Sequence, residues 1–148
     1  FCRQNPPVCL LEEECRKNGV FAVEMAKSAP RVIAEKVNIE HMDADLHKIE
    51  VCVKNQGYLP THGTFAALKT SALRPIKAKL EIEMQDVQGD VEIVSGKAEQ
   101  DLGQLDGHVL GNDRKKKATW IVRAKPGSIV EITVTSTRAG IVRKTIEL

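Results

Sequence analysis

The hydrophobic pattern of the chain changes at Arg31, and this change constrains the fold more than any other feature. Before Arg31, apolar residues recur at spacings of three, four or seven, which is the period of an amphipathic helix. After Arg31, apolar and polar residues alternate, which is the period of strands with one face in water. The sequence therefore predicts one helix within residues 1–30 and a β-domain over residues 31–148.

The segment before Arg31 carries the start and stop signals of a helix. Asn5 is a candidate N-cap, and Pro6 and Pro7 suit the first turn because its amides have no partner inside the helix. Pro30 ends the helix, since a proline disfavours helical geometry in the residue before it. Five residues share one face at helical spacing and need a surface to pack on: Leu11, Cys15, Ala22, Met25 and Ala29.

The alternation after Arg31 predicts a series of strands separated by short turns. No helix is expected between them, which favours antiparallel pairing. The predicted fold class is mainly β: an antiparallel immunoglobulin- or fibronectin-like β-sandwich preceded by one N-terminal α-helix. The predicted strands are Val32–Glu40, Leu46–Lys54, Gly63–Ser71, Ile76–Met84, Asp90–Val94, Ala118–Ala124, Ile129–Ser136 and Val142–Leu148.

The same alternation predicts the core and the last turns. Trp120 lies in an alternating strand and is expected in the core. Segments 124–130 ("AKPGSIV") and 136–142 ("STRAGIV") are typical of hairpin turns and are expected to join the last three strands. The residues predicted to point inward are Ile49, Val51, Val53, Leu80, Ile82, Met84, Val130, Ile132 and Val134.

The charge balance argues against two classes of partner. The chain has 22 basic and 20 acidic residues and a formal net charge of +2. Domains that bind nucleic acid or anionic membranes carry concentrated basic charge. The basic run Arg114–Lys117 is short and is expected in a mobile, solvated loop. There is no apolar run of about eighteen residues and no signal-peptide pattern, so we expect neither nucleic acid nor a membrane as partner.

The cysteines favour a reducing compartment. Cys2, Cys9 and Cys15 crowd the N-terminus, no Cys-x-x-Cys pair occurs, and Cys52 stands alone. Cys9 and Cys15 do not face each other on a helix, so a disulfide between them is disfavoured. We expect free thiols and a cytoplasmic location. The chain begins at Phe1 without Met, which suggests a fragment or a processed product.

Familiar active-site motifs are missing from the sequence. The histidines form no H-E-x-x-H motif, and there is neither a G-x-S-x-G elbow nor a G-x-x-x-x-G-K-[ST] phosphate loop. One dense donor cluster occurs, His41-x-Asp43-x-Asp45-x-His47, at a predicted strand-to-strand turn. Polar residues are expected at such a turn anyway, and adventitious metal binding is the alternative. We therefore predict no catalytic residue, no metal ligand and no cofactor in this chain.

The stretch "KNQGYLPTHGT" after the second predicted strand is richer in turn residues than a plain hairpin needs. It is predicted to be a rigid corner in which Gly57 and Pro60 set the chain path while Tyr58 and Leu59 seal one end of the sandwich. Truncating a buried Tyr58 to Ala should then cost about 3 kcal/mol. A surface that recognises a ligand is the alternative. The candidate residues for either role are Asn55, Gly57, Tyr58, Leu59, Pro60 and Thr61.

Four segments resemble the C-terminal portion of bacterial zinc carboxypeptidases of the funnelin, or carboxypeptidase A-like, class. "FCRQNPPVCLLEEE" is similar to the end of their catalytic domain, and "FAVEMAKSAPRV" to the close of the following helix. Residues 53–61 match the family's Val-x-Asn-x-Gly-Tyr-Leu-Pro-Thr stretch. "ATWIVRAKPGSIVEITVTSTRAGIVRKTIEL" is similar to its closing strands, although Ala124 stands where glycine is expected. The resemblance covers essentially the whole chain.

The resemblance implies an accessory role. The family's zinc ligands, a His-x-x-Glu pair and a later His, and its general-base Glu precede the Asn-Pro-Pro segment, so none can be carried onto this chain. Residues 1–30 would continue from an absent, zinc-containing catalytic domain, and residues 31–148 would form a non-catalytic sandwich that supports that domain or substrate access. The parent would be a hydrolase that removes C-terminal residues from peptides, whereas this chain would not be an enzyme.

The implied partner is the parent's catalytic domain in cis. In isolation, the chain should expose an apolar patch around Leu11, Cys15, Phe21 and Met25, or dimerise through this helix face. The alternative function is a carbohydrate- or cell-wall-peptide-binding module, for which Tyr58 is the plausible stacking platform. A Tyr58 ring exposed beside His62 and the basic run would favour this alternative, and a buried ring would oppose it.

Overall fold

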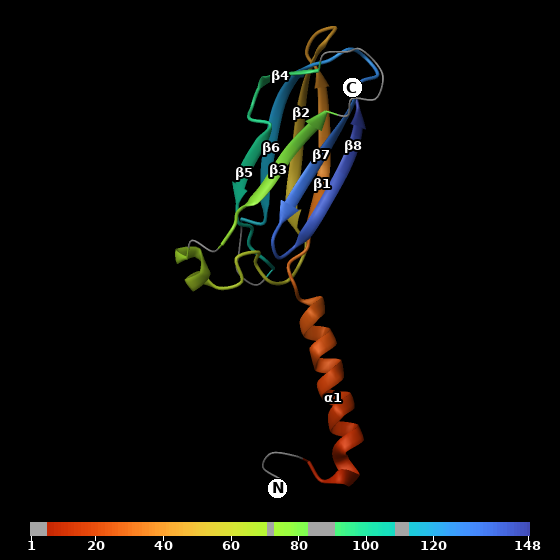
Figure 1. Ribbon diagram of the computed structural model, residues 1–148, viewed down its shortest axis with the longest axis vertical. Helices are drawn as coiled ribbons and strands as arrows, with labels where there is room; N and C mark the ends of the chain where they lie inside the picture. Colours follow the sequence, from red (N-terminus) through yellow and green to blue (C-terminus); the bar gives the residue numbers. More distant parts are fainter. Residues whose placement is uncertain (1–5, 71–72, 83–90, 109–112) are drawn as a thin grey trace.

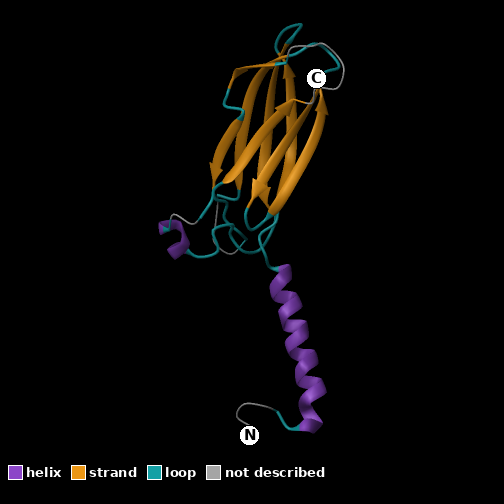
Figure 2. Ribbon diagram, in the orientation of Figure 1, coloured by secondary structure: helices purple, strands orange, loops and turns teal. Residues whose placement is uncertain are grey.

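The computed structural model describes residues 6–70, 73–82, 91–108 and 113–148, and it confirms the predicted fold class. One helix precedes antiparallel strands in two sheets, of order β1-β2-β6-β4 and β5-β3-β7-β8, which pack face to face (Figures 1 and 2). The elements are α1 (Val8–Lys27), β1 (Val32–His41), β2 (Leu46–Asn55), the 3-10 helix η1 (Phe65–Lys69), β3 (Ile76–Ile82), β4 (Glu92–Ser95), β5 (Glu99–Gly103), β6 (Lys115–Arg123), β7 (Ile129–Ser136) and β8 (Gly140–Glu147).

Alternating residues of both sheets fill one core between them. Trp120 of β6 is fully buried, as predicted, and its Nε1–H donates to Lys97 O at 2.8 Å, so its polar atom is satisfied. Met84 and the side chain of Ile82 lie outside the described residues. The other residues predicted to point inward are all buried: Ile49, Val51, Val53, Leu80, Val130, Ile132 and Val134.

The strand predicted at Gly63–Ser71 is wrong. Gly63 turns the chain with φ of +76°, and residues 65–69 form η1 instead, while Ser71 lies outside the described residues. Thr64 begins this turn, since its Oγ1 accepts a hydrogen bond from Ala67 N at 3.4 Å. Phe65 remains exposed. The apparent alternation therefore has no sheet face to pack on.

The prediction that the basic run Arg114–Lys117 lies in a solvated loop is wrong, because β6 begins at Lys115. The Lys117 amino group lies 2.9 Å from a carboxylate oxygen of Glu50 on the neighbouring strand β2, and the Lys115 amino group lies 2.5 Å from one of Glu35 on β1, the next strand beyond it. Cross-strand ion pairs therefore hold the run on the outer face of the sheet. The prediction also missed β5, a short strand in which only Leu102 is buried.

One of the two predicted hairpin turns is correct. Residues 136–142 hold the turn between the paired strands β7 and β8, where Gly140 adopts φ of +84°. Residues 124–130 do not form a hairpin, because β6 and β7 belong to different sheets and this segment crosses between them. Ala124 N donates to Asp45 O at 2.8 Å, which fixes the start of the crossing.

Helix α1 projects away from one end of the sandwich (Figure 1), and none of its 20 residues is buried. It ends at Lys27, ahead of Pro30 as predicted, whereas the predicted cap Asn5 lies outside the described residues. In the described part of the chain, no helix has the length and apolarity needed to cross a membrane. The predicted apolar patch is exposed in full: Leu11, Cys15, Phe21 and Met25.

The cysteines that the structure describes are free thiols. Cys9 and Cys15 are exposed on α1, and Cys52 is half-buried on β2. Cys2 lies outside the described residues.

Candidate functional site

The corner, residues 55–61, joins the end of α1 to the sandwich, and Asn55 is its centre. The Asn55 side chain is fully buried. Its Oδ1 accepts hydrogen bonds from Arg31 N at 3.0 Å and Gly57 N at 2.9 Å. Its Nδ2 donates to Leu59 O at 2.9 Å and Asp106 O at 3.0 Å. One amide thereby connects the segment after α1, the corner itself and the chain before β6.

Backbone contacts hold the segment that leaves α1 against the corner. Leu59 N donates to Ser28 O at 3.0 Å, and Gln56 N donates to Arg31 O at 2.7 Å. Gly57 packs so closely that a Cβ there would overlap Ala29 O and would lie 2.7 Å from Arg31 N. Glycine is needed at position 57 because another backbone occupies the space of a side chain.

A second set of bonds ties the corner to residues 104–107. Thr61 Oγ1 donates to Gln104 Oε1 at 2.7 Å and accepts from Leu105 N at 2.9 Å. Thr61 N donates to Leu105 O at 2.9 Å. Gly107 packs against the Tyr58 backbone, with which any Cβ would overlap. Backbone and side-chain hydrogen bonds therefore fix the corner from both sides.

Tyr58 and Leu59 do not seal the sandwich, which corrects the prediction. Their side chains are 57% and 37% exposed, because the close backbone packing on both sides of residues 57–59 leaves these side chains facing solvent. Buried Asn55, Pro60 and His62 fill the corner instead. Hydrogen bonds hold the corner on both sides, but a polar amide rather than an aromatic ring lies at its centre.

His62 is a candidate functional residue whose burial the sequence did not predict. It is buried, its ring lies 5.5 Å from that of Phe65, and its Nε2 lies 3.8 Å from Asp106 Oδ1. Its Nδ1 has no hydrogen-bond partner among the described residues. Its carbonyl oxygen accepts a hydrogen bond from Arg138 Nη1 at 3.0 Å. The turn residues around His62 gave no signal for this burial.

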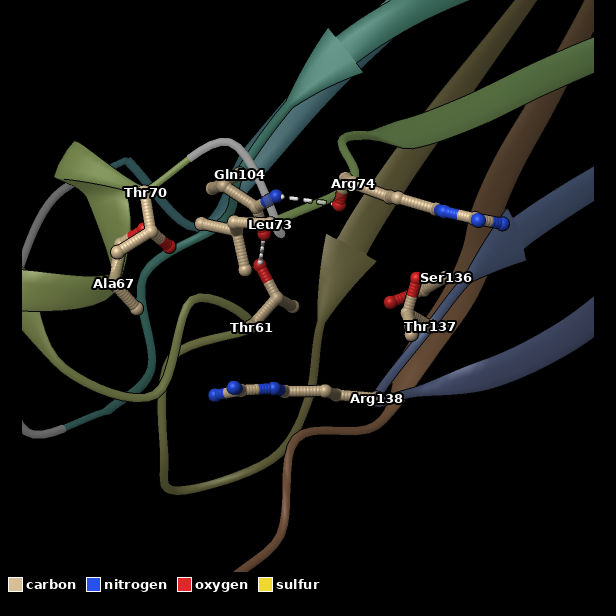
Figure 3. Close-up of a pocket in the computed structure, with 9 residues that line it drawn as sticks. All are labelled: Thr61, Ala67, Thr70, Leu73, Arg74, Gln104, Ser136, Thr137 and Arg138. Atoms are coloured by element: carbon tan, nitrogen blue, oxygen red, sulfur yellow. Dashed lines mark hydrogen bonds between the residues drawn. The ribbon is translucent and has the colours of Figure 1, made fainter.

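A small pocket of about 130 Å³ lies beside the corner (Figure 3). Gln104 Nε2 donates to Arg74 O at 2.8 Å and closes one wall, and the Arg138 guanidinium extends toward Thr61 (Figure 3). The lining combines hydroxyl, guanidinium and amide groups without a nucleophile paired to a base. The residues that line it are Thr61, Ala67, Thr70, Leu73, Arg74, Gln104, Ser136, Thr137 and Arg138.

The described residues contain no group of three or more His, Cys, Asp or Glu side chains that could hold a metal ion. His47 and Glu50 have the His-x-x-Glu spacing of zinc peptidases, but both lie on β2. Residues three apart on a strand point to opposite faces, and His47 is buried while Glu50 pairs with Lys117 on the outer face. This spacing therefore does not make a ligand pair.

Comparison with known proteins places the sandwich in a family. A family model described as "Domain of unknown function (DUF8731)" matches residues 31–147, from the approach to β1 to the end of β8. No curated protein matches the chain.

Among solved structures, the chain is similar to beta-glucosidase 3B from Thermotoga neapolitana, at 8% identity and a TM-score of 0.34. It is also similar to DesR, a beta-glucosidase from Streptomyces venezuelae, at 12% identity and a TM-score of 0.33. These matches cover 80% of this chain and only 16% and 15% of the two enzymes. By its family match, the chain belongs to the DUF8731 family.

Proposed function

We propose that this chain is the non-catalytic C-terminal β-sandwich domain of a zinc-dependent metallocarboxypeptidase, and that α1 anchors it to the catalytic domain in cis. The observation that carries the anchoring role is the exposure of apolar side chains on α1, combined with the rigid corner at its end. The kind of parent rests on the sequence resemblance. The catalytic zinc would belong to the preceding domain.

The distribution of apolar residues on α1 favours burial in a large partner. Residues 20–26 contain one charged side chain, Glu24, and expose Val20, Phe21, Val23 and Met25. A helix that is apolar on several sides is normally enclosed by other elements, whereas a single stripe suffices for pairing of two helices. We therefore favour docking on a catalytic domain over dimerisation through one helix face.

The corner gives this docking a defined direction. The bonds from Leu59 N and Gln56 N, together with Asn55 Oδ1, hold residues 28–31 in one path. The sandwich would then follow the catalytic domain at a fixed orientation rather than on a flexible linker. A domain held in this way can support its neighbour or limit the approach of substrates.

A zinc-supplemented carboxypeptidase assay tests the proposal. It compares this chain with the same chain extended upstream through the preceding region of its reading frame. We expect cleavage of C-terminal residues only in the extended protein. Activity in this chain alone, or an extended protein without peptidase activity, would contradict the proposal.

A pair of substitutions tests the role of α1 separately from the kind of parent. Phe21 on α1 is 65% exposed and Ile141 on β8 is 60% exposed, so they are matched in solvent access. In the extended protein, Phe21→Asp should lower the melting temperature because it would place a charge in the interface. Ile141→Asp should have a much smaller effect. Equal effects of the two substitutions would contradict docking through α1.

The exposure of the Tyr58 ring favours a second candidate function, a carbohydrate- or cell-wall-peptide-binding module. Exposed rings are the platforms on which sugars stack. However, His62 is buried and the lysines of the basic run pair with acids, so neither supplies polar groups around the ring. Sedimentation with insoluble peptidoglycan tests this candidate: retention that Tyr58→Ala abolishes would favour it, and no retention would exclude it for this ligand.

A further inference from the structure

A pair of histidines lies across the β1–β2 hairpin, at the end of the sandwich opposite α1 (Figure 1). His41 ends β1 and is the register partner of His47 on β2. The rings meet edge to face, with centroids 4.9 Å apart, and their Nδ1 atoms are 2.7 Å apart. His47 is buried and His41 is exposed. The pair thus combines a buried imidazole, His47, with a solvent-accessible one, His41.

The surroundings of His47 fix which of its nitrogens carries hydrogen. His47 Nε2 lies 3.1 Å from Ala124 O, and a carbonyl oxygen only accepts, so Nε2 is the protonated nitrogen. Neutral His47 therefore presents a lone pair at Nδ1, which accepts the hydrogen bond from His41 Nδ1–H. Metal-bound histidines have this arrangement, with one nitrogen on the ion and the other donating to a carbonyl or carboxylate.

The two aspartates of the hairpin have other partners. Asp43 Oδ1 accepts a hydrogen bond from Ala44 N at 2.8 Å, and Asp45 Oδ2 lies 3.5 Å from Arg123 Nε. Within the described residues they do not join the histidines in a group of three or more metal ligands. Two imidazoles are therefore the protein ligands available, and water would fill the remaining positions on an ion.

We propose that His41 and His47 form a two-histidine site for a divalent ion that prefers imidazole, such as Ni²⁺, Cu²⁺ or Zn²⁺. The ion would replace the hydrogen that the two Nδ1 atoms share. Ligand bonds of about 2.0–2.1 Å require the two nitrogens to be roughly 3 Å apart, so the exposed His41 ring needs only a small shift. Neutral His41 loses its Nδ1 proton to water and gains one at Nε2, which leaves its charge unchanged.

Titration calorimetry with Ni²⁺ on the untagged chain tests the site. All four cysteines are replaced by serine, because free thiols compete for the ion. We expect one Ni²⁺ per chain, bound at least tenfold more weakly after His41→Ala and unchanged after His108→Ala, which removes an exposed histidine elsewhere. Absence of binding, or equal affinity in the His41→Ala variant, would overturn the proposal.

Thermal unfolding supplies an independent readout. Saturating Ni²⁺ should raise the melting temperature of the cysteine-free chain and of its His108→Ala variant, because the ion binds the histidine pair only in the folded chain. The melting temperature of the His41→Ala variant should not respond to Ni²⁺. Without metal, its melting temperature should remain close to that of the cysteine-free chain, because His41 is exposed. An equal rise in both histidine variants would place the metal elsewhere and refute the site.

Discussion

Replacing Asn55 by Ala is expected to destabilise the sandwich by about 4 kcal/mol. The side chain is fully buried and makes four hydrogen bonds, to the backbones of Arg31, Gly57, Leu59 and Asp106. A hydrogen bond contributes about 1 kcal/mol net, and buried groups left without partners add to the loss. The four bonds therefore sum to about 4 kcal/mol, which is large for a single substitution.

Urea unfolding followed by the fluorescence of Trp120, the single tryptophan, measures this loss. The transition midpoint should fall while the slope of free energy against urea stays constant. Tyr58→Ala in the same corner is the matched control and should cost less than about 1 kcal/mol, because surface substitutions have small effects. A loss below about 1 kcal/mol for Asn55→Ala, or of about 3 kcal/mol for Tyr58→Ala, would refute the assignment of Asn55 as the centre of the corner.

Gly57→Ala should destabilise the chain by about 1–3 kcal/mol, since its Cβ would overlap the Ala29–Arg31 backbone. Gly19→Ala should favour α1 itself by about 0.5–1 kcal/mol, because position 19 is in a helix with open space around it. The urea titration measures the Gly57→Ala loss, and far-ultraviolet circular dichroism measures the gain in helix content from Gly19→Ala. A Gly57→Ala midpoint that does not fall, or a Gly19→Ala helix signal that does not rise, would contradict the packing. Hydrogen bonds from Lys115 and Lys54 lower the pKa of Glu35 from 4.5 to about 2. Its contribution to stability is therefore present above pH 4.5 and is lost as the pH falls toward 2. Glu35→Gln should flatten the pH dependence of the urea midpoint in this window, and an unchanged dependence would contradict the ion pairs.

Local periodicity was enough to predict the sandwich and its core. Val51 and Val134 alternate with polar neighbours, and two packed sheets bury such residues whatever the order of the strands. The position of Gly57 was also readable, because glycine and proline mark tight turns. The sequence did not indicate that residues 124–130 cross between the two sheets. This crossing depends on how β6 and β7 pair with strands that are distant in sequence.

The centre of the corner was missed for the same physical reason. Asn55 had one local signal, the tendency of Asn to bond the backbone two residues on, which it does with Gly57 N. Of its three other partners, Leu59 is four residues on, whereas Arg31 and Asp106 are distant in sequence. Tyr58 was predicted to seal the sandwich because turn residues surround it, but the backbone packs closely at Gly57 and Gly107, and its ring lies in solvent.

Hydrogen exchange of the α1 amides tests the anchoring role most directly. It compares residues 8–27 in this chain with the same residues in the protein extended upstream. In this chain α1 has no buried residue and so lacks the tertiary packing that stabilises most helices, and its amides should exchange rapidly. Strong protection of α1 in the extended protein is the predicted result, and equally rapid exchange in both proteins would contradict the anchor.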